Sequence, residues 1–221
     1  MNETVVVITG SDSIAPAVAQ RIPAEATVIA ADGALDHALA AGLLPAGLVG
    51  DMDSISAAGL DWAGRHAIVE RHDPDKDHTD TELALMMAVD RKPAHLILVG
   101  AGDRLDHVFA AIGALGQPHL TAIPLIDAWW DEQWIRILHG PGTTTLEIAE
   151  GSTLSLLALH GPCSGVTITG VRWPLERADL APLVGVGVSN VAVDEQVTVR
   201  VSTGVLTIVM PGHRSNDRDA S

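Results

Sequence analysis

The sequence predicts an α/β domain, with a parallel sheet covered by helices on both faces, followed by an all-β sandwich or barrel domain. In the first half, short β-branched runs alternate with helical patterns, which is typical of strand–helix–strand units. In the second half, short apolar runs punctuated by Gly, Pro and Ser follow one another almost without helical patterns, which is typical of antiparallel sheets. We place the boundary near residues 128–140, which gives domains at 1–130 and 131–213 and a disordered tail at 214–221.

Two segments of the first half carry the clearest signals. Residues 4–9 (TVVVIT) form a continuous β-branched run, as expected of a strand buried on both faces. Residues 79–91 begin with Thr79 and place Glu82 three positions later, the pattern of a capping box at a helix start. The other expected elements are helices at 14–21, 34–41 and 105–115, strands at 27–31, 48–49, 96–99 and 121–126, and a brief apolar run at 67–70.

The second half is expected to consist mainly of short strands. The apolar runs predict them at 134–138, 143–148, 153–159, 166–169, 197–201 and 205–210. The segment 175–183 has a weak helical pattern, and Cys163 is expected in a loop. We interpret Trp129, Trp130 and Trp134, near the boundary, as packing or dimer-interface residues.

Charge and cysteine content narrow the function classes. The 221 residues carry a formal charge of −15 and no Lys/Arg-rich run, so nucleic acid and anionic membranes are not expected as partners. Cys163 is the only cysteine, which fits a reducing compartment. The N-terminal residues 1–10 have no basic segment of the kind that opens a signal peptide. We therefore expect a cytoplasmic protein. Because the chain and phosphates are both anionic, phosphate binding by this protein would require a divalent metal.

Acidic residues follow several of the predicted strands, at the sheet edge where ligands bind in α/β folds. Asp51 and Asp53 come directly after the strand at 48–49. In an extended segment, residues two apart point to the same side, so both carboxylates would face one point, which is costly unless a cation lies there. The alternative is a solvated acidic turn with Ser54 as a helix cap.

Two further clusters suit phosphate binding. The acidic run 73–82 ends at a helix start, which attracts anions, with Asp80 available to a metal and Lys76 to phosphate. The Gly-rich turn in 100–107 lies between a strand and a helix and contains Arg104, whose guanidinium suits bidentate phosphate contacts. Taken alone, this turn is more typical of a capped strand–helix connection with a surface Arg–Asp pair than of a phosphate site.

Taken in order, these motifs resemble the motif series of thiamine pyrophosphokinases, over residues 5–211. The segments that carry the resemblance are ADGA (31–34), GDMDS (50–54), DKDHTD (75–80), RLDH (104–107), GVRWPL (170–175) and VSN (188–190). Three positions depart from the family pattern: Met52 stands where Phe is usual, the ADGA segment has one Gly where two are common, and Asp103 stands where Gly is common.

The resemblance implies transfer of the β,γ-diphosphate of ATP to the hydroxyl of thiamine, with AMP released, by a homodimer with sites near the subunit interface. It implies Mg²⁺ ligands at Asp51, Asp53 and Asp80, ATP contacts at Asp32, Gly33, Lys76, Thr79, Arg104, Asp106 and His107, with Arg104 also catalytic, and thiamine contacts at Ser189 and Asn190. Trp173 suits stacking on the cationic, aromatic vitamin, and its alternative role is filling the core between two sheets.

Other functions stay open from the sequence. A diphosphokinase of similar fold acting on another alcohol, such as a hydroxymethylpterin, would use the same carboxylates. A metal-dependent phosphohydrolase would cleave ATP without an acceptor. A non-catalytic nucleotide or thiamine sensor would bind ligands without turnover. The group that accepts the hydroxyl proton is not assigned, although a carboxylate near the metal suits that task.

Overall fold

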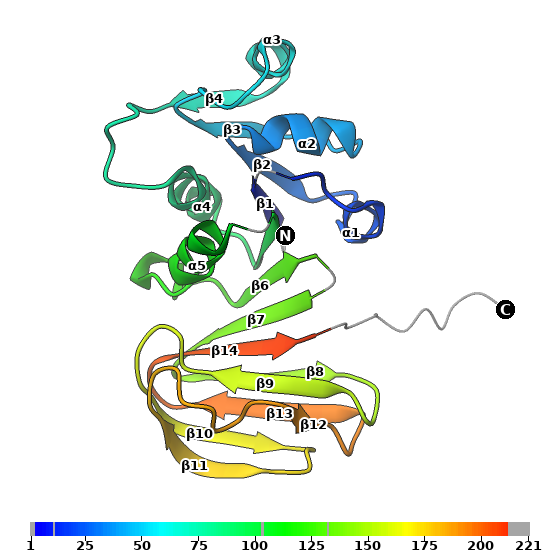
Figure 1. Cartoon of the computed structure of the whole chain (residues 1–221), viewed down its shortest axis with the longest axis vertical. Coiled ribbons are helices and arrows are strands. Elements are labelled where there is room, and N and C mark those ends of the chain that lie inside the picture. The colour runs from blue at the N-terminus through cyan, green and yellow to red at the C-terminus, as the bar shows by residue number, and fades with distance from the viewer. Residues whose placement is uncertain (1–2, 11, 103, 132, 212–221) are drawn as a thin grey trace, which may run out of the picture. The chain divides into compact units, whose positions relative to one another are not determined.

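The computed structural model describes residues 3–10, 12–102, 104–131 and 133–211 (Figure 1). The chain divides into two compact units, Met1–Asp131 and Glu132–Ser221. The expected tail at 214–221 and the departure at Asp103 lie outside the described residues.

The first unit is built around a parallel sheet with the strand order β6-β5-β1-β2-β3-β4. Its elements in chain order are β1 (Thr4–Gly10), α1 (Pro16–Arg21), β2 (Thr27–Ala31), α2 (Ala34–Ala40), β3 (Gly47–Gly50), α3 (Ala57–His66), β4 (Ile68–Arg71), α4 (Asp80–Asp90), β5 (His95–Ala101), α5 (Leu105–Ala114), a 3-10 turn (Pro118–Leu120) and β6 (Leu125–Trp130). The predicted α/β class is therefore confirmed.

Helices cover both faces of this sheet, as two neighbouring residues of β3 show. Leu48 is fully buried in a cluster with Leu35 of α2 and Ala63 of α3. The preceding residue, Gly47, points to the opposite face, where a Cβ would lie 2.7 Å from Sδ of Met87 in α4. Thus α2 and α3 pack on one face and α4 on the other (Figure 1).

The structure differs from the predicted elements of this unit at two places. The strand expected at 121–126 is instead β6, Leu125–Trp130, because a 3-10 turn and Pro124 precede it. Trp129 and Trp130 are thus buried strand residues, which confirms their packing role. Helix α3 was not predicted, since Gly59 and Gly64 weaken its helical pattern.

The second unit consists of two antiparallel sheets that enclose one apolar core. Its strands are β7 (Gln133–His139), β8 (Gly142–Glu147), β9 (Thr153–Leu157), β10 (Cys163–Thr169), β11 (Leu175–Leu180), β12 (Asn190–Val191), β13 (Gln196–Val201) and β14 (Val205–Met210). Strands β12-β9-β14-β7 form one sheet and β11-β10-β13-β8 the other. Alternate residues such as Val197, Val199 and Val201 enter the shared core, so the predicted sandwich is confirmed.

Two expectations for this unit were wrong. The weak helical pattern at 175–183 is strand β11, because its residues pair antiparallel with β10 and this pairing overrides their helical preference. Cys163 does not lie in a loop. It is the first residue of β10, it is fully buried, and its thiol donates a hydrogen bond to the Val205 carbonyl at 3.3 Å.

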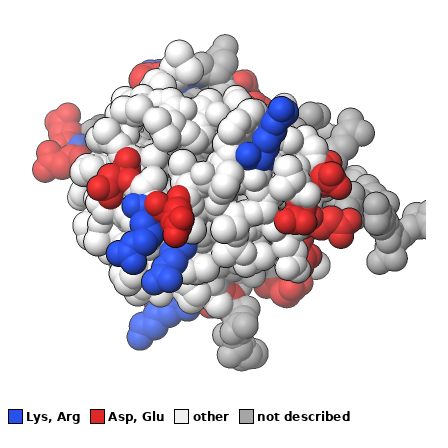
Figure 2. All heavy atoms as spheres, turned by 90° about the horizontal axis from the view of Figure 1, so that it is seen from below, with Lys and Arg blue, Asp and Glu red and all other residues white. Residues whose placement is uncertain are grey.

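Figure 2 shows one face of the molecule, on which the few basic side chains stand alone or beside acidic ones, in a largely uncharged surface. Over the described ranges, none of the helices has both the length and the apolar character that a bilayer span requires.

Candidate active site

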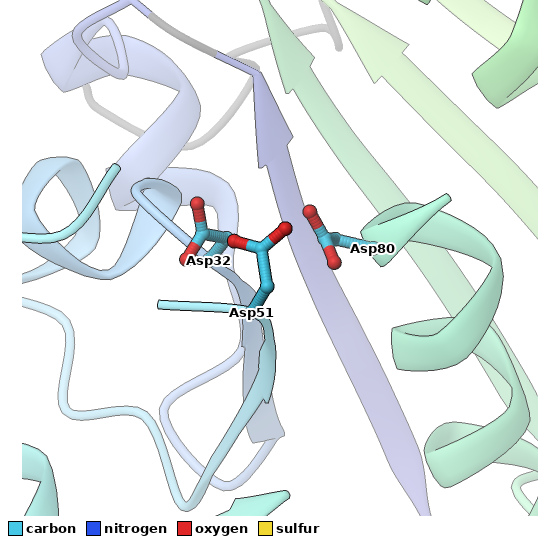
Figure 3. Close-up of side chains that lie close together, drawn as sticks. All are labelled: Asp32, Asp51 and Asp80. Carbon is cyan, nitrogen blue, oxygen red and sulfur yellow. The ribbon is translucent and has the colours of Figure 1, made fainter. Parts of the chain in front are cut away.

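Three carboxylates meet at the carboxyl edge of the parallel sheet. Asp32 follows β2, Asp51 follows the neighbouring strand β3, and Asp80 is the first residue of α4. Each contributes one oxygen to a group in which all three oxygens lie within 4.8 Å of one another (Figure 3). Adjacent parallel strands end at the same edge, so the sheet order itself brings Asp32 and Asp51 together.

The backbone around the cluster is constrained. Gly50 has a φ of +153°, and a Cβ there would lie 2.8 Å from the Cβ of Asp32 and 3.2 Å from Oδ1 of Asp80. Asp32 and Met52 have positive φ values of 44° and 68°, which non-glycine residues rarely adopt. Strained positions of this kind concentrate at functional sites, where the surrounding structure holds them.

The Gly50→Ala variant is expected to lose about 1–3 kcal/mol of unfolding free energy, since its methyl group would push Asp32 away from Asp80 and strain the backbone. Chemical denaturation followed by circular dichroism measures the loss. Gly64→Ala in α3 is the matched control, because open space surrounds Gly64 and alanine favours a helix. An unchanged stability of Gly50→Ala would contradict the close approach described here.

Lys76 neutralises part of the carboxylate charge. Its Nζ lies 3.3 Å from Oδ2 of Asp51 and 3.0 Å from Oδ1 of Asp80. Burial alone would lower the pKa of Lys76, but its two carboxylate partners outweigh burial and the pKa is raised. The backbone N–H of Asp53 and the ammonium of Lys76 lower the pKa of Asp51 against the effect of burial.

Asp32 is the least compensated member of the cluster. It is 6% exposed, and burial raises its pKa, with the negative charges of Asp80 and Asp51 adding to the shift. Oδ1 of Asp32 is buried without a hydrogen-bond donor, and Oδ1 of Asp80 also lacks a well-directed donor although Lys76 is close. Buried carboxylate oxygens without donors are costly unless a cation pairs with them.

The oxygen set fits a magnesium ion. Mg²⁺ prefers oxygen ligands and is usually held by carboxylates together with substrate phosphates and water. One oxygen from each of Asp32, Asp51 and Asp80 lies within 4.8 Å of the other two, so a single ion could contact all three carboxylates. Asp53, predicted as a third ligand, lies outside this group: its carboxylate accepts a hydrogen bond from Oγ of Ser54 at 2.7 Å. The third carboxylate of the group is that of Asp32.

A cavity of about 570 Å³ opens beside the carboxylates, within the size range of small-ligand sites. Of the residues predicted for metal or ATP, seven line it: Asp32, Gly33, Lys76, Thr79, Asp80, Asp106 and His107. Other lining residues were not proposed as site residues, among them Thr9, Gly10, His37, Ser54, His78 and Thr81. Gly10 could have been predicted as a site residue, because it directly follows the predicted strand at 4–9 and so lies at the same edge of the sheet.

The start of α4 is fixed by the predicted capping box. The Thr79 hydroxyl accepts from the Glu82 N–H at 3.2 Å, and the Glu82 carboxylate accepts from the Thr79 N–H at 2.9 Å. This arrangement holds Asp80 in the first turn, facing the cavity, and directs the positive end of the helix dipole at it.

Arg104 lies at a smaller recess next to the main cavity, which is also lined by Trp130 and His107. Its guanidinium pairs with Asp106, with Nη2 2.7 Å from Oδ2, and both side chains are exposed. Trp130 supports the preceding turn, since its indole N–H donates to the Gly102 carbonyl at 3.2 Å and its ring fills the space that a side chain at Gly100 would need.

In the second unit, Asn190 is bound to the backbone of Trp173. Its Oδ1 accepts from the Trp173 N–H at 3.1 Å and from the Val191 N–H at 2.9 Å, and its Nδ2 donates to the Trp173 carbonyl at 2.7 Å. Asn190 is buried, whereas the Trp173 side chain is 54% exposed, with the Arg172 guanidinium 5.0 Å from the centre of its ring. Core filling, the alternative role for Trp173, is therefore wrong. Ser189 is exposed, with a φ of 58°.

Comparison with protein families gives one match in each unit. A model described as the thiamin pyrophosphokinase catalytic domain matches residues 18–126. A second, described as the thiamin pyrophosphokinase vitamin B1 binding domain, matches residues 143–206. The first match contains the carboxylate cluster, and the second contains Trp173, Ser189 and Asn190.

Individual proteins agree with the family models. The chain is 26% identical to thiamine pyrophosphokinase of Bacillus subtilis, over 77% of this chain and 80% of that protein. It is 28% identical to thiamine pyrophosphokinase 1 of rice, over 70% of this chain and 61% of that protein. The crystal structure of the B. subtilis protein aligns with a TM-score of 0.79 at 23% identity, covering 96% of this chain and all of that chain. The Candida albicans thiamin pyrophosphokinase aligns with a TM-score of 0.72 at 15% identity, covering 95% of this chain and 89% of that chain.

Proposed function

The chain belongs to the thiamin pyrophosphokinase family, and we propose that it transfers the diphosphate of ATP to the hydroxyl of thiamine, giving thiamine diphosphate and AMP. The observation that carries the proposal is the combination of both family matches with a three-carboxylate cluster beside a cavity of about 570 Å³. Diphosphoryl transfer demands positioning and charge neutralisation more than covalent chemistry, and the site is suited to those tasks.

Asp51 and Asp80 are the proposed core of a Mg²⁺ site. The geometry favours Asp32 as their third partner, and the sequence motif favours Asp53. A bound Mg²⁺ would neutralise phosphate charge and draw electron density from the attacked β-phosphorus. The buried Oδ1 of Asp32, which has no hydrogen-bond donor, supports a cation here.

The residues around the cavity would hold the phosphates of ATP. Lys76 and the N-terminus of α4, fixed by the Thr79 cap, offer positive charge on one side. Gly33 lies where a Cβ would come within 2.9 Å of the Ser54 carbonyl, so the turn after β2 stays tight and its backbone accessible. Arg104, Asp106 and His107 are proposed nucleotide contacts at the other side, and Arg104 would neutralise charge as the β-phosphorus is attacked.

Thiamine recognition is proposed for the second unit. The exposed ring of Trp173 suits stacking on a cationic aromatic ligand, and Ser189 lies exposed next to the Asn190 clamp. We also propose a homodimer that works in the cytoplasm. Leu105 and Phe109, one turn apart on α5, have exposed apolar side chains. These side chains support the proposal that a second subunit packs on α5, next to the cavity.

Purified protein incubated with ATP, Mg²⁺ and thiamine is expected to form AMP and thiamine diphosphate in equal amounts, because the second product carries the two phosphates that leave ATP. Chromatography of both products in one sample measures the ratio. AMP or ADP formed without thiamine diphosphate would contradict the proposal and point to a hydrolase, or to another acceptor if a hydroxymethylpterin restores stoichiometry. Binding without nucleotide consumption would point to a sensor.

A further inference from the structure

Lys76 places its ammonium against two of the three carboxylates of the cluster. Its ammonium lies between Asp51 and Asp80, 3.3 Å from one carboxylate and 3.0 Å from the other. The side chain is only 14% exposed, so these two contacts replace most of its hydration. An ammonium this far removed from water depends on its anionic partners.

A divalent ion at this cluster needs two of the same carboxylates. Oδ2 of Asp51 and Oδ1 of Asp80, which contact Lys76, belong to two of the three side chains whose oxygens converge. An ion bound there would lie within a few ångströms of the ammonium, where two positive charges repel strongly in a partly buried site. The ion and Lys76 therefore compete for Asp51 and Asp80.

We propose that Lys76 is a built-in competitor of the divalent cation, which neutralises the empty cluster and gives way only when a nucleotide phosphate offers its ammonium another partner. The inference rests on the proposed function of the same site. Lys76 lines the cavity together with Thr79 and Asp80, so a phosphate held there lies within its reach. Lys76 belongs to the turn before α4, with its N–H bonded to the Asp73 carbonyl, so its side chain can reorient without unwinding the helix.

This arrangement makes metal and nucleotide binding cooperative. Without nucleotide, an entering ion must break both Lys76 contacts, so its affinity is low. With nucleotide, the phosphates accept Lys76 and the carboxylates become available to the ion. Coupling between two ligands of one protein is commonly 5- to 150-fold in affinity.

Calorimetric titration with Mn²⁺ alone, without nucleotide, tests the proposal. We expect Lys76→Met to bind Mn²⁺ about tenfold more tightly than the unmodified protein, a change within the usual range of coupling. Lys76→Arg, which keeps the charge, should bind about as weakly as the unmodified protein. Lys92→Met is the matched control, because Lys92 is the only other lysine of the chain and is exposed at the end of α4.

Addition of a non-hydrolysable ATP analogue should raise Mn²⁺ affinity strongly in the unmodified protein and only weakly in Lys76→Met. Equal or weaker Mn²⁺ binding by Lys76→Met would overturn the inference while leaving the metal site intact. Absence of Mn²⁺ binding by every variant, with and without the analogue, would overturn the metal site and the inference together.

Lys76→Met leaves three carboxylates without a counter-charge, so it is to be purified with Mn²⁺ present. A second measurement uses the unmodified protein and therefore does not depend on the stability of Lys76→Met. Brief acetylation with acetic anhydride, followed by peptide mass analysis, reports the reactivity of Lys76 relative to Lys92. Saturating Mn²⁺ alone should raise the relative reactivity of Lys76 severalfold, since its ammonium is displaced from the carboxylates. An unchanged ratio at saturating Mn²⁺ would show that ion and ammonium do not compete.

Discussion

The Asp51→Asn variant is expected to lose turnover by a factor of about a thousand or more while keeping its fold. Asp51 contributes an oxygen to the carboxylate cluster and contacts Lys76, so an amide removes one negative charge from the centre of the proposed metal site. The loss of one electrostatic partner at a phosphoryl-transfer centre is worth several kcal/mol. The fold should survive because the amide oxygen can still accept the hydrogen bond that the Asp53 N–H donates to Asp51 Oδ1.

The rate of AMP formation as a function of Mg²⁺ concentration measures this effect. Asp61→Asn in α3 is the control, since Asp61 is an exposed carboxylate paired with Arg65 on the same helix. Its turnover should stay within about twofold of the unmodified enzyme, as expected for a surface ion pair. Turnover near normal in Asp51→Asn would remove the carboxylate cluster from the mechanism.

The same titration compares the two candidates for the third ligand. Asp32→Asn should weaken Mg²⁺ binding more than Asp53→Asn, because Asp32 has a buried oxygen without a donor and Asp53 already pairs with Ser54. Asparagine also tolerates the positive φ of 44° at position 32. The opposite order would favour the assignment made from the sequence motif.

The sequence placed acidic side chains at this sheet edge, and the choice of metal ligands among them stays a prediction. Carboxylates at strand ends and the Thr79–Glu82 capping box placed Asp51 and Asp80 at one sheet edge. The pairing of Asp51 with Asp53 assumed an extended chain. Instead, β3 ends at Gly50 and Met52 has a φ of 68°, so the extended geometry assumed for this pair does not hold here.

Strand order explains how the carboxylates of Asp32 and Asp51 come together. Asp32 lies 19 positions before Asp51 in the chain, and only the pairing of β2 with β3 places their carboxylates together. Side-chain periodicity reports which face of an element is buried, but not which strands are neighbours. The wrong helix prediction at 175–183 has the same cause, because the pairing of this segment with β10 depends on residues elsewhere in the chain.

Trp173→Ala is expected to raise the KM for thiamine about 30-fold, with kcat and the KM for ATP changed less than about threefold. An exposed indole that stacks on a cationic aromatic ligand contributes roughly 2 kcal/mol in favourable sites. Arg172 lies over the ring, so thiamine would use the other ring face or displace the guanidinium. Trp173→Phe, which keeps an aromatic face, should lie between the two. A thiamine KM unchanged in Trp173→Ala would leave the ring without a part in binding.

Asn190 is expected to act through Trp173 rather than on thiamine itself. Both carbonyl lone pairs and one amide hydrogen of Asn190 are already used by the Trp173 and Val191 backbone. Asn190→Ala should therefore raise the thiamine KM to a similar extent as Trp173→Ala, and also lower the unfolding free energy by about 2–4 kcal/mol, since buried backbone groups lose their partners.

The double variant separates the two roles. If Asn190 only positions Trp173, the thiamine KM of Trp173→Ala with Asn190→Ala equals that of Trp173→Ala alone, because the clamp has no ring left to hold. If Asn190 contacts thiamine directly, the two effects multiply and the KM rises well beyond either single variant. The structure favours the first result, since the side chain is buried against the segment whose ring is exposed.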